Sequence, residues 1–246
     1  MYRNVLMLST LAVPLLVVTT ACNKADRTAR TAEEGTRART TETQPVNFAY
    51  VRFVDASARP VSLYFGNEKE FTGDSKSVSD YKRVPAERRE FALRDDAHMT
   101  GDPLAKNSEG LGNDKYYTVV TWDDKGGKAD LRVVNDTESA PASGKAKIRI
   151  IHAAPGMDAI DLYASGHKDK LASESRFTSA SNWQEVDPVT GPLEIRTSNK
   201  NDNPVRIANV TLQPGKMYTF VVFGGQKAGE RVSVIPIVDN PKEAKS

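Results

Sequence analysis

The chain has 246 residues, of which 39% are hydrophobic, 27% are charged and 7% are aromatic. This ordinary globular composition excludes a collagen-like chain, a wholly disordered chain and a multi-span membrane protein. The 34 Lys and Arg residues against 32 Asp and Glu leave a formal net charge of +2. Because binding to a phosphate backbone requires a concentrated basic surface, nucleic acid is not an expected partner.

Residues 1–21 have the features of a secretory signal peptide. Arg3 supplies a positive charge near the start, and residues 5–18 form an apolar run interrupted by Pro14. That run is about 14 residues long, which is shorter than the roughly 20 residues that a membrane-spanning helix needs. The segment therefore predicts export rather than a transmembrane helix.

The end of this segment resembles a bacterial lipoprotein signal, in which a small residue precedes the cysteine that is acylated. Ala21 is followed by Cys22, the single cysteine of the chain, although Thr19 stands where such signals usually carry Leu. The resemblance implies cleavage between Ala21 and Cys22 and a lipid on the Cys22 thiol. Asn23 follows where Asp would signal inner-membrane retention, which favours the outer membrane of the cell envelope. The alternative is an ordinary signal peptide followed by an unpaired cysteine.

Residues 22–47 are predicted to be an acylated cysteine followed by a disordered tether. The segment is rich in Thr, Ala, Arg and Glu and has almost no large aliphatic side chain. Such a composition buries too little apolar area to offset the entropy of ordering. Residues 240–246 read as a polar tail.

The remaining chain contains an internal repeat. Matching residues recur in the same order at a separation of roughly 100 residues, which is the size of a whole domain. The pairs are Val51/Ile148, Arg52/Arg149, Leu63/Leu162, Tyr64/Tyr163, Tyr81/Trp183, Val84/Val186, Phe91/Leu193, Arg94/Arg196, Leu111/Leu212, Tyr117/Tyr218 and Thr118/Thr219. We therefore expect two domains, over 48–137 and 145–239. The connection 138–144 is compatible with independent movement or with a fixed interface.

Each copy has the pattern of short β-strands. Residues 147–151, 160–163, 193–196 and 205–212 mostly alternate apolar and polar side chains, and Pro, Gly, Asn and Asp separate them. This pattern is typical of an all-β sandwich or barrel. Residues 86–94 have helical propensity, but the repeat partner of this segment does not, so we predict a strand there.

The segment from Leu212 to Tyr218 indicates a tyrosine corner. Pro214 and Gly215 suit a type II turn, and a tyrosine three residues later resembles the corner of immunoglobulin-like sandwiches. Tyr117 holds the matching position in the first copy. Both tyrosines are predicted to be structural, and the alternative is an ordinary hairpin with a tyrosine in its second strand.

These motifs together resemble the bacterial domain-of-unknown-function 4397 family. The resemblance rests on residues 148–156, on Ile160 to Tyr163 and on Leu212 to Tyr218. It is weaker in the first copy, where Asp55 replaces His152. The family resemblance implies two tandem immunoglobulin-like β-sandwich domains and a location in the cell envelope. It implies no established activity.

The best local candidates for a binding or catalytic site are His152, Asp158 and Asp161. A histidine beside two carboxylates could orient a metal or perform acid–base chemistry. The structural alternative is that His152 bonds the backbone at a strand end and that Asp161 lies on the solvent face. His98 and His167 fall in polar loops without a second ligand at zinc spacing. The acidic stretch 123–130 is predicted to be a turn between strands, as is 201–204.

The sequence has no Gly-x-Ser-x-Gly nucleophile elbow, no His-Glu-x-x-His zinc motif, no phosphate-binding loop and no dinucleotide-binding motif. We therefore expect no catalytic residues, metal or cofactor. The favoured hypothesis is a non-enzymatic lipoprotein, anchored through Cys22, that presents two sandwiches to an envelope protein or glycan. A structural spacer or assembly factor that pairs through a strand edge at 232–238 is the alternative, although Pro236 interrupts that edge. A hydrolase centred on His152 is the third hypothesis.

Overall fold

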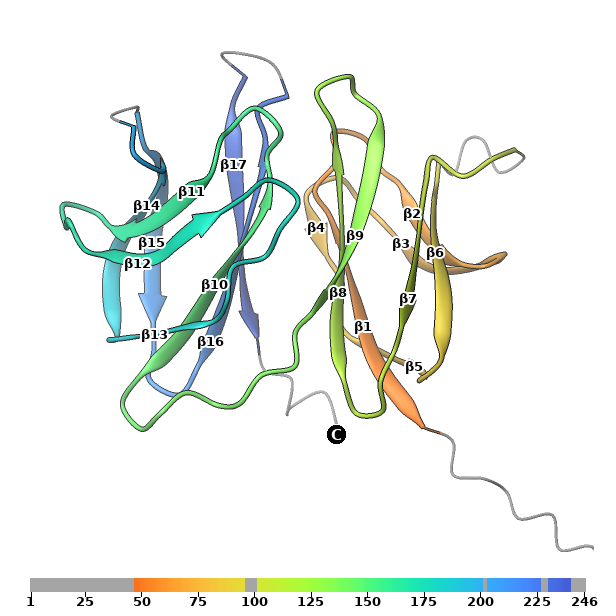
Figure 1. Ribbon diagram of the computed structural model, residues 1–246, viewed down its shortest axis with the longest axis horizontal. Helices are drawn as coiled ribbons and strands as arrows, with labels where there is room; N and C mark the ends of the chain where they lie inside the picture. Colours follow the sequence, from red (N-terminus) through yellow and green to blue (C-terminus); the bar gives the residue numbers. More distant parts are fainter. Residues whose placement is uncertain (1–46, 96–100, 201–202, 227–229, 240–246) are drawn as a thin grey trace, which may run out of the picture. The chain divides into compact units, whose positions relative to one another are not determined.

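The computed structural model describes residues 47–95, 101–200, 203–226 and 230–239, which all fall within one compact unit of the chain. Every regular element that they form is a β-strand, as the sequence predicts (Figure 1). Among these residues, no helix is long and apolar enough to cross a membrane. Residues 1–46, with Ala21 and Cys22, lie outside the described residues, as do His98, 201–202 and 240–246.

The first sandwich is built from two sheets. Sheet A has the order β4-β1-β8-β9, with β5 also paired to β1, and sheet B has the order β3-β2-β6-β7. The strands are β1 (Phe48–Asp55), β2 (Ser62–Phe65), β3 (Glu68–Thr72), β4 (Ser77–Val78), β5 (Lys82–Pro85), β6 (Arg88–Arg94), β7 (Ala105–Gly110), β8 (Tyr116–Asp123) and β9 (Ala129–Asn135). The segment with helical propensity forms β6, so the strand predicted from the repeat is confirmed.

The second sandwich repeats this topology, except that β13 alone lies beside β10 where β4 and β5 both pair with β1. Sheet C has the order β13-β10-β16-β17, and sheet D has the order β12-β11-β14-β15. The strands are β10 (Ala146–Ala153), β11 (Ile160–Ala164), β12 (Lys170–Ser175), β13 (Gln184–Val186), β14 (Val189–Thr197), β15 (Val205–Leu212), β16 (Met217–Gly224) and β17 (Val232–Asp239).

The predicted repeat is visible in the strand register. In each sandwich the first strand pairs in parallel with the strand that carries the corner tyrosine. Val51 lies opposite Tyr117 in the first sandwich, and Ile148 lies opposite Tyr218 in the second. The two copies therefore share their hydrogen-bonding pattern as well as their sequence landmarks.

Each sandwich has its own apolar core between its two sheets. Val51, Phe53 and Phe91 are buried in the first core, and Ile148, Ile195 and Phe220 are buried in the second. Phe220, two residues after the corner tyrosine Tyr218, is fully covered. Two immunoglobulin-like domains therefore each bury an alternating strand face, as a sandwich requires.

A third buried cluster joins sheet A to sheet C. It includes Val54 and Trp122 of the first sandwich and Ile151, Val221 and Phe223 of the second. Strands β8 and β10 are consequently buried along both faces. In these strands the apolar and polar residues that alternate in the sequence point to two opposite faces, and both faces are buried. The polar residues of β10 are therefore not exposed to solvent.

Candidate functional site

The loop that follows the first strand of each sandwich is organised by one buried polar side chain. In the first sandwich this residue is Asp55, whose Oδ1 accepts hydrogen bonds from the backbone N–H of Ser57 at 3.1 Å and from its hydroxyl at 2.5 Å. Its Oδ2 accepts a bond from the Val61 N–H at 3.2 Å. Burial raises the pKa of Asp55, although these hydrogen bonds oppose the shift.

His152 holds the matching position in the second sandwich. Its Nδ1 accepts a hydrogen bond from the Ala154 N–H at 3.2 Å, and its Nε2 lies 2.9 Å from the backbone carbonyl oxygen of Asp158. These two contacts assign a neutral imidazole with the proton on Nε2. Burial lowers the pKa of His152. The residue is fully covered and both ring nitrogens are occupied, so its imidazole is not accessible from solvent.

The side chains of Asp158 and Asp161 do not join His152 in a site. The Asp158 carboxylate is exposed and pairs with Lys200, which lowers its pKa. Asp161 is only 1% exposed, so the expected position on the solvent face is wrong. Its Oδ1 accepts a bond from the Glu174 N–H at 2.8 Å, and its Oδ2 lies 3.0 Å from the Lys170 Nζ. Strand β12 covers this carboxylate, which sequence alternation alone does not reveal.

The acidic stretch after β8 forms the turn predicted between two strands. Asp124 Oδ1 accepts hydrogen bonds from the N–H groups of Gly126 at 2.7 Å and Lys128 at 2.9 Å. Asp123, the last residue of β8, is 4% exposed, and its Oδ2 accepts a bond from the Ala58 N–H at 2.6 Å. The turn is therefore tied to the β1–β2 loop.

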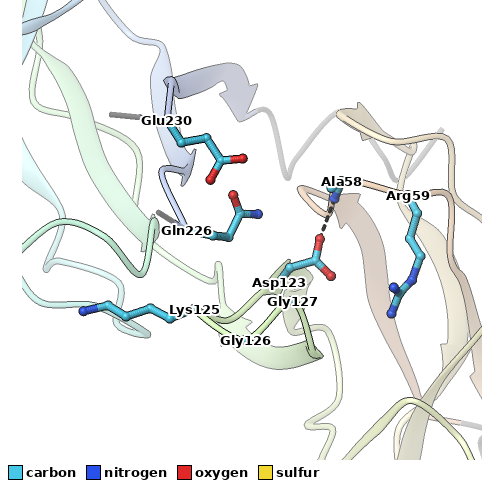
Figure 2. A pocket seen from close by; sticks show the side chains of 8 residues that line it. All are labelled: Ala58, Arg59, Asp123, Lys125, Gly126, Gly127, Gln226 and Glu230. Atoms are coloured by element: carbon cyan, nitrogen blue, oxygen red, sulfur yellow. Dashed lines mark hydrogen bonds between the residues drawn. The ribbon is translucent and has the colours of Figure 1, made fainter. Parts of the chain in front are cut away.

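Loops from both sandwiches line a polar depression of about 330 Å³ beside this turn. Residues 58–59 come from the β1–β2 loop, Asp123 and 125–127 come from the β8–β9 turn, and Gln226 and Glu230 come from the second sandwich. Figure 2 shows the side chains of Gln226 and Glu230 pointing toward the wall formed by Asp123 and Ala58. Cations and carboxylates are mixed there, so the depression suits a polar ligand of low net charge.

A second depression, of about 440 Å³, lies on the other side of the same turn. Pro155, Met157 and half-buried Phe177 give it a more apolar lining, and residues 124–126 border it. The Phe177 ring packs edge-on against Trp122 at a centroid distance of 6.0 Å and against His152 at 5.9 Å. We call the two depressions and the turn between them the loop surface.

The loop surface depends on a close approach between two backbones of the second sandwich. A Cβ atom on Gly156 would overlap the carbonyl oxygen of Gly225. Only glycine therefore fits at position 156, which brings the β10–β11 loop against residue 225 at the end of β16. This explains the glycine at position 156.

No group of three His, Cys, Asp or Glu side chains within the described ranges is placed to hold a metal ion. His167 lies in an exposed turn after β11, and its N–H donates to the Ala164 carbonyl. The side chains that the structure does bring together, those of the loop surface, include polar and apolar groups from loops of both sandwiches.

A family model described as a domain of unknown function, DUF4397, matches the chain twice, over residues 49–163 and 148–246. The two matches correspond to the two sandwiches, with an overlap in β10 and β11. The chain belongs to the DUF4397 family. No curated protein matches this tandem DUF4397 chain.

Solved structures similar to the DUF4397 chain have low sequence identity. The C-terminal domain of AlgF from P. aeruginosa is 19% identical with a TM-score of 0.31, and the match covers 39% of this chain and 99% of that domain. A family CBM26 protein from Eubacterium rectale Amy13K, in complex with maltoheptaose, is 13% identical with a TM-score of 0.23, covering 79% and 99%. The tip fimbrial protein Mfa3 from Porphyromonas gingivalis is 8% identical with a TM-score of 0.26, covering 80% and 100%.

Both DUF4397 repeats have the hydrogen bond that defines a tyrosine corner. The Tyr117 hydroxyl oxygen accepts a bond from the Gly112 N–H at 3.0 Å, and the Tyr218 hydroxyl oxygen accepts one from the Gln213 N–H at 2.9 Å. In the second repeat, Gly215 has a φ of 77°, as the predicted type II turn requires.

Sequence reasoning missed Asp123 and Phe177 as members of the loop surface. Asp123 appeared only as the start of an acidic turn, and Phe177 appeared in no motif. One signal could have identified Asp123. It lies at the end of a strand, and its neighbour Asp124 accepts the hydrogen bonds of the turn, so the Asp123 carboxylate is not needed there. No comparable signal marks Phe177, because its position depends on the packing of one sandwich against the other.

Proposed function

We propose that this DUF4397 chain is a non-enzymatic lipoprotein of the cell envelope whose loop surface binds a protein or glycan partner. One observation carries the binding proposal. Asp123 Oδ1 is buried at the polar depression, and no group among the described residues donates a hydrogen bond to it. An unpaired buried acceptor is costly, and a hydroxyl or amide N–H of a ligand would satisfy it.

The chemistry of the loop surface supports a partner rich in hydrogen-bond donors. Arg59 and Lys125 add cationic donors, while Asp123 adds a carboxylate acceptor. Phe177 and Met157 offer apolar contact on the far side of the turn. Sugar rings and peptide segments both present this combination of donors and an apolar face.

The binding test uses a Cys22→Ser chain, which lacks the thiol proposed to carry the lipid, and two probes: purified envelope polysaccharide and an extract of envelope proteins. Asp123→Asn keeps one oxygen for the Ala58 N–H but removes the carboxylate charge. We expect Asp123→Asn and Lys125→Ala, tested as two separate variants, each to weaken binding at least tenfold. Equal binding by the parent chain and both variants would exclude the loop surface.

The matched control is Lys106→Ala. Lys106 lies in β7 and forms an exposed ion pair with Glu90, at 3.2 Å, away from the loop surface. Removal of an exposed lysine there changes the net charge as Lys125→Ala does. The control should bind as the parent chain does, so any loss common to both lysine variants would indicate a non-specific charge effect.

Membrane anchoring is proposed from the sequence features around Cys22. The intact mass of the native protein should show a lipid on Cys22, and Cys22→Ser should move the protein from the membrane to the soluble fraction. An unmodified, soluble native protein would overturn the anchor while leaving the binding proposal open to its own test.

A spacer or assembly role is the second candidate, and the β17 edge favours it. β17 is an edge strand of sheet C, and Val238 is 56% exposed. Pro236, opposite Phe220 in the ladder, has no N–H to offer a further strand and counts against pairing at that point of the edge. An envelope partner whose capture is lost in Val238→Lys but kept in Asp123→Asn would favour this role.

A further inference from the structure

A buried group of charged side chains connects the two repeats. In the first repeat, the Arg52 Nε donates to the Thr118 hydroxyl oxygen at 2.8 Å, and that hydroxyl donates to Asp136 at 2.5 Å. Asp136 also accepts a bond from the Tyr81 hydroxyl at 2.8 Å. The Arg52 guanidinium lies 3.7 Å from its own aspartate, Asp136, which is the longer of its two ion pairs. It reaches into the second repeat and lies 2.5 Å from Asp239.

The second repeat has the same arrangement. The Arg149 Nε donates to the Thr219 hydroxyl oxygen at 2.9 Å, and that hydroxyl donates to Asp239. The Arg149 guanidinium pairs with Asp136, across the boundary between the repeats. Each arginine also lies over an aromatic ring of its own repeat, Arg52 over Tyr81 and Arg149 over Trp183.

The two halves of this group correspond residue by residue in the repeat. Arg52, Thr118 and Asp136 match Arg149, Thr219 and Asp239, and all six are at most 3% exposed. Each repeat contributes one cation and one anion, and each pairs with the opposite charge of the other repeat. We call these six residues the crossed pairs.

We propose that the outer faces of sheets A and C form an association surface whose partner is another DUF4397 repeat with the same Arg, Thr and Asp residues. In this chain the partner is the chain's own other repeat. The crossed pairs select that partner, because a surface without the matching charges would leave an arginine and an aspartate buried without their closest opposite charges. The apolar cluster around Trp122 and Phe223 supplies the contact area. Association then does not depend on the covalent connection 138–144.

The first test cuts that connection in the folded full chain. A protease site is inserted between Ala142 and Ser143, which are both exposed, and the chain is cleaved after purification. Light scattering after size exclusion should give the mass of the uncut chain for the cleaved sample at micromolar concentration. Separation of the two fragments would overturn the proposal.

The second test asks whether the charges select the partner. In the cleaved chain, Asp136→Arg places a third cation beside Arg149 and Arg52, and we expect the fragments to separate. Adding Arg149→Asp restores opposite charges across the boundary, so the double variant should associate at least tenfold more tightly than the single variant. Equal association of the parent, single and double variants would overturn the selective role of the crossed pairs.

The control for these variants is Glu90→Lys, a charge reversal at the exposed Lys106 pair of sheet B. It should leave the cleaved fragments associated. If Asp136→Arg does not fold before cleavage, the double variant is compared with the single variant Arg149→Asp instead. The proposal requires the fragments of that single variant to separate as well. Folding of every chain is checked by circular dichroism before cleavage.

Discussion

His152 and Asp55 show how different residues perform one local task. Both lie at the end of a central strand and bond the backbone of the next loop, but one is a neutral imidazole and the other a carboxyl group. The substitution in the first repeat therefore preserves a loop anchor. A catalytic role would have required an exposed imidazole, and His152 is fully buried.

His152 should make the stability of the second sandwich depend on pH. Burial lowers its pKa in the folded chain, whereas the unfolded chain takes up a proton near the ordinary value of about 6.5. The unfolded state therefore binds more protons as the pH falls below 6.5, and the folded state loses stability. We expect the unfolding free energy to fall by about 1 kcal/mol more between pH 7.5 and 5.5 in the parent than in His152→Gln.

Urea unfolding at the two pH values measures this difference. His167→Gln serves as the control, because His167 is exposed and should leave the pH dependence of the parent unchanged. A His152→Gln chain whose unfolding free energy depends on pH as the parent's does would contradict the assignment of a neutral buried imidazole.

The aromatic residues beside the crossed pairs differ between the two repeats in that only one of them has a hydroxyl group. Tyr81 donates a hydrogen bond to Asp136, whereas its counterpart Trp183 lies over Arg149. Burial tends to raise the pKa of Asp136, but the charges of Arg149 and Arg52 outweigh it and lower the pKa. For Asp239, burial prevails over the two arginines and raises the pKa. The two repeats are thus similar in geometry and unequal in electrostatics.

At the level of elements, the contact between Gly156 and Gly225 determines how the β10–β11 loop is placed. Gly156→Ala forces a Cβ against the Gly225 carbonyl oxygen, so we expect a loss of about 2 kcal/mol of unfolding free energy. Gly110→Ala is the control, since a Cβ there meets no atom within 4 Å. Chemical denaturation compares the two, and equal stabilities would contradict the close approach.

The tyrosine corners should contribute to stability through one hydrogen bond each. Tyr218→Phe leaves the Gln213 N–H without its partner, and we expect a loss of about 1–2 kcal/mol. Tyr50→Phe provides a comparison, because that ring stacks on Tyr116 in β8 at a centroid distance of 4.5 Å and should keep the contact. Thermal denaturation of both variants measures the effect, and a Tyr218→Phe chain as stable as the parent would argue against the corner.

At the level of the whole molecule, the two sandwiches should unfold together. Arg149→Ala leaves Asp136 buried without its closest cation, which we expect to cost about 3 kcal/mol and to separate one calorimetric transition into two. Arg206→Ala removes an ion pair in which the arginine is 68% exposed, so its cost should stay below about 1 kcal/mol. Two transitions already present in the parent would contradict the coupling.

The sequence predicted the strands, the repeat and the corner turns because these depend on local spacing and turn chemistry. It did not predict the face-to-face packing of sheets A and C. In β10 the alternation of Ile148, Arg149 and Ile150 is typical of a strand with one solvent-exposed face, yet Arg149 is 1% exposed. Whether a polar face meets water or a second domain depends on a partner surface about 100 residues away, which no local pattern encodes.

The central position of β1 has a consequence for the order of folding. β1 pairs with β8 through contacts such as Tyr50 with Tyr116, so it needs a neighbour that is synthesised much later. A polypeptide that emerges N-terminus first, from a ribosome or a translocation channel, exposes the apolar side chains of β1 until β8 arrives. Such non-local pairing slows closure and favours aggregation in the interval. β10 must wait for β16 in the same way, so each repeat offers one early strand for a holding chaperone to cover.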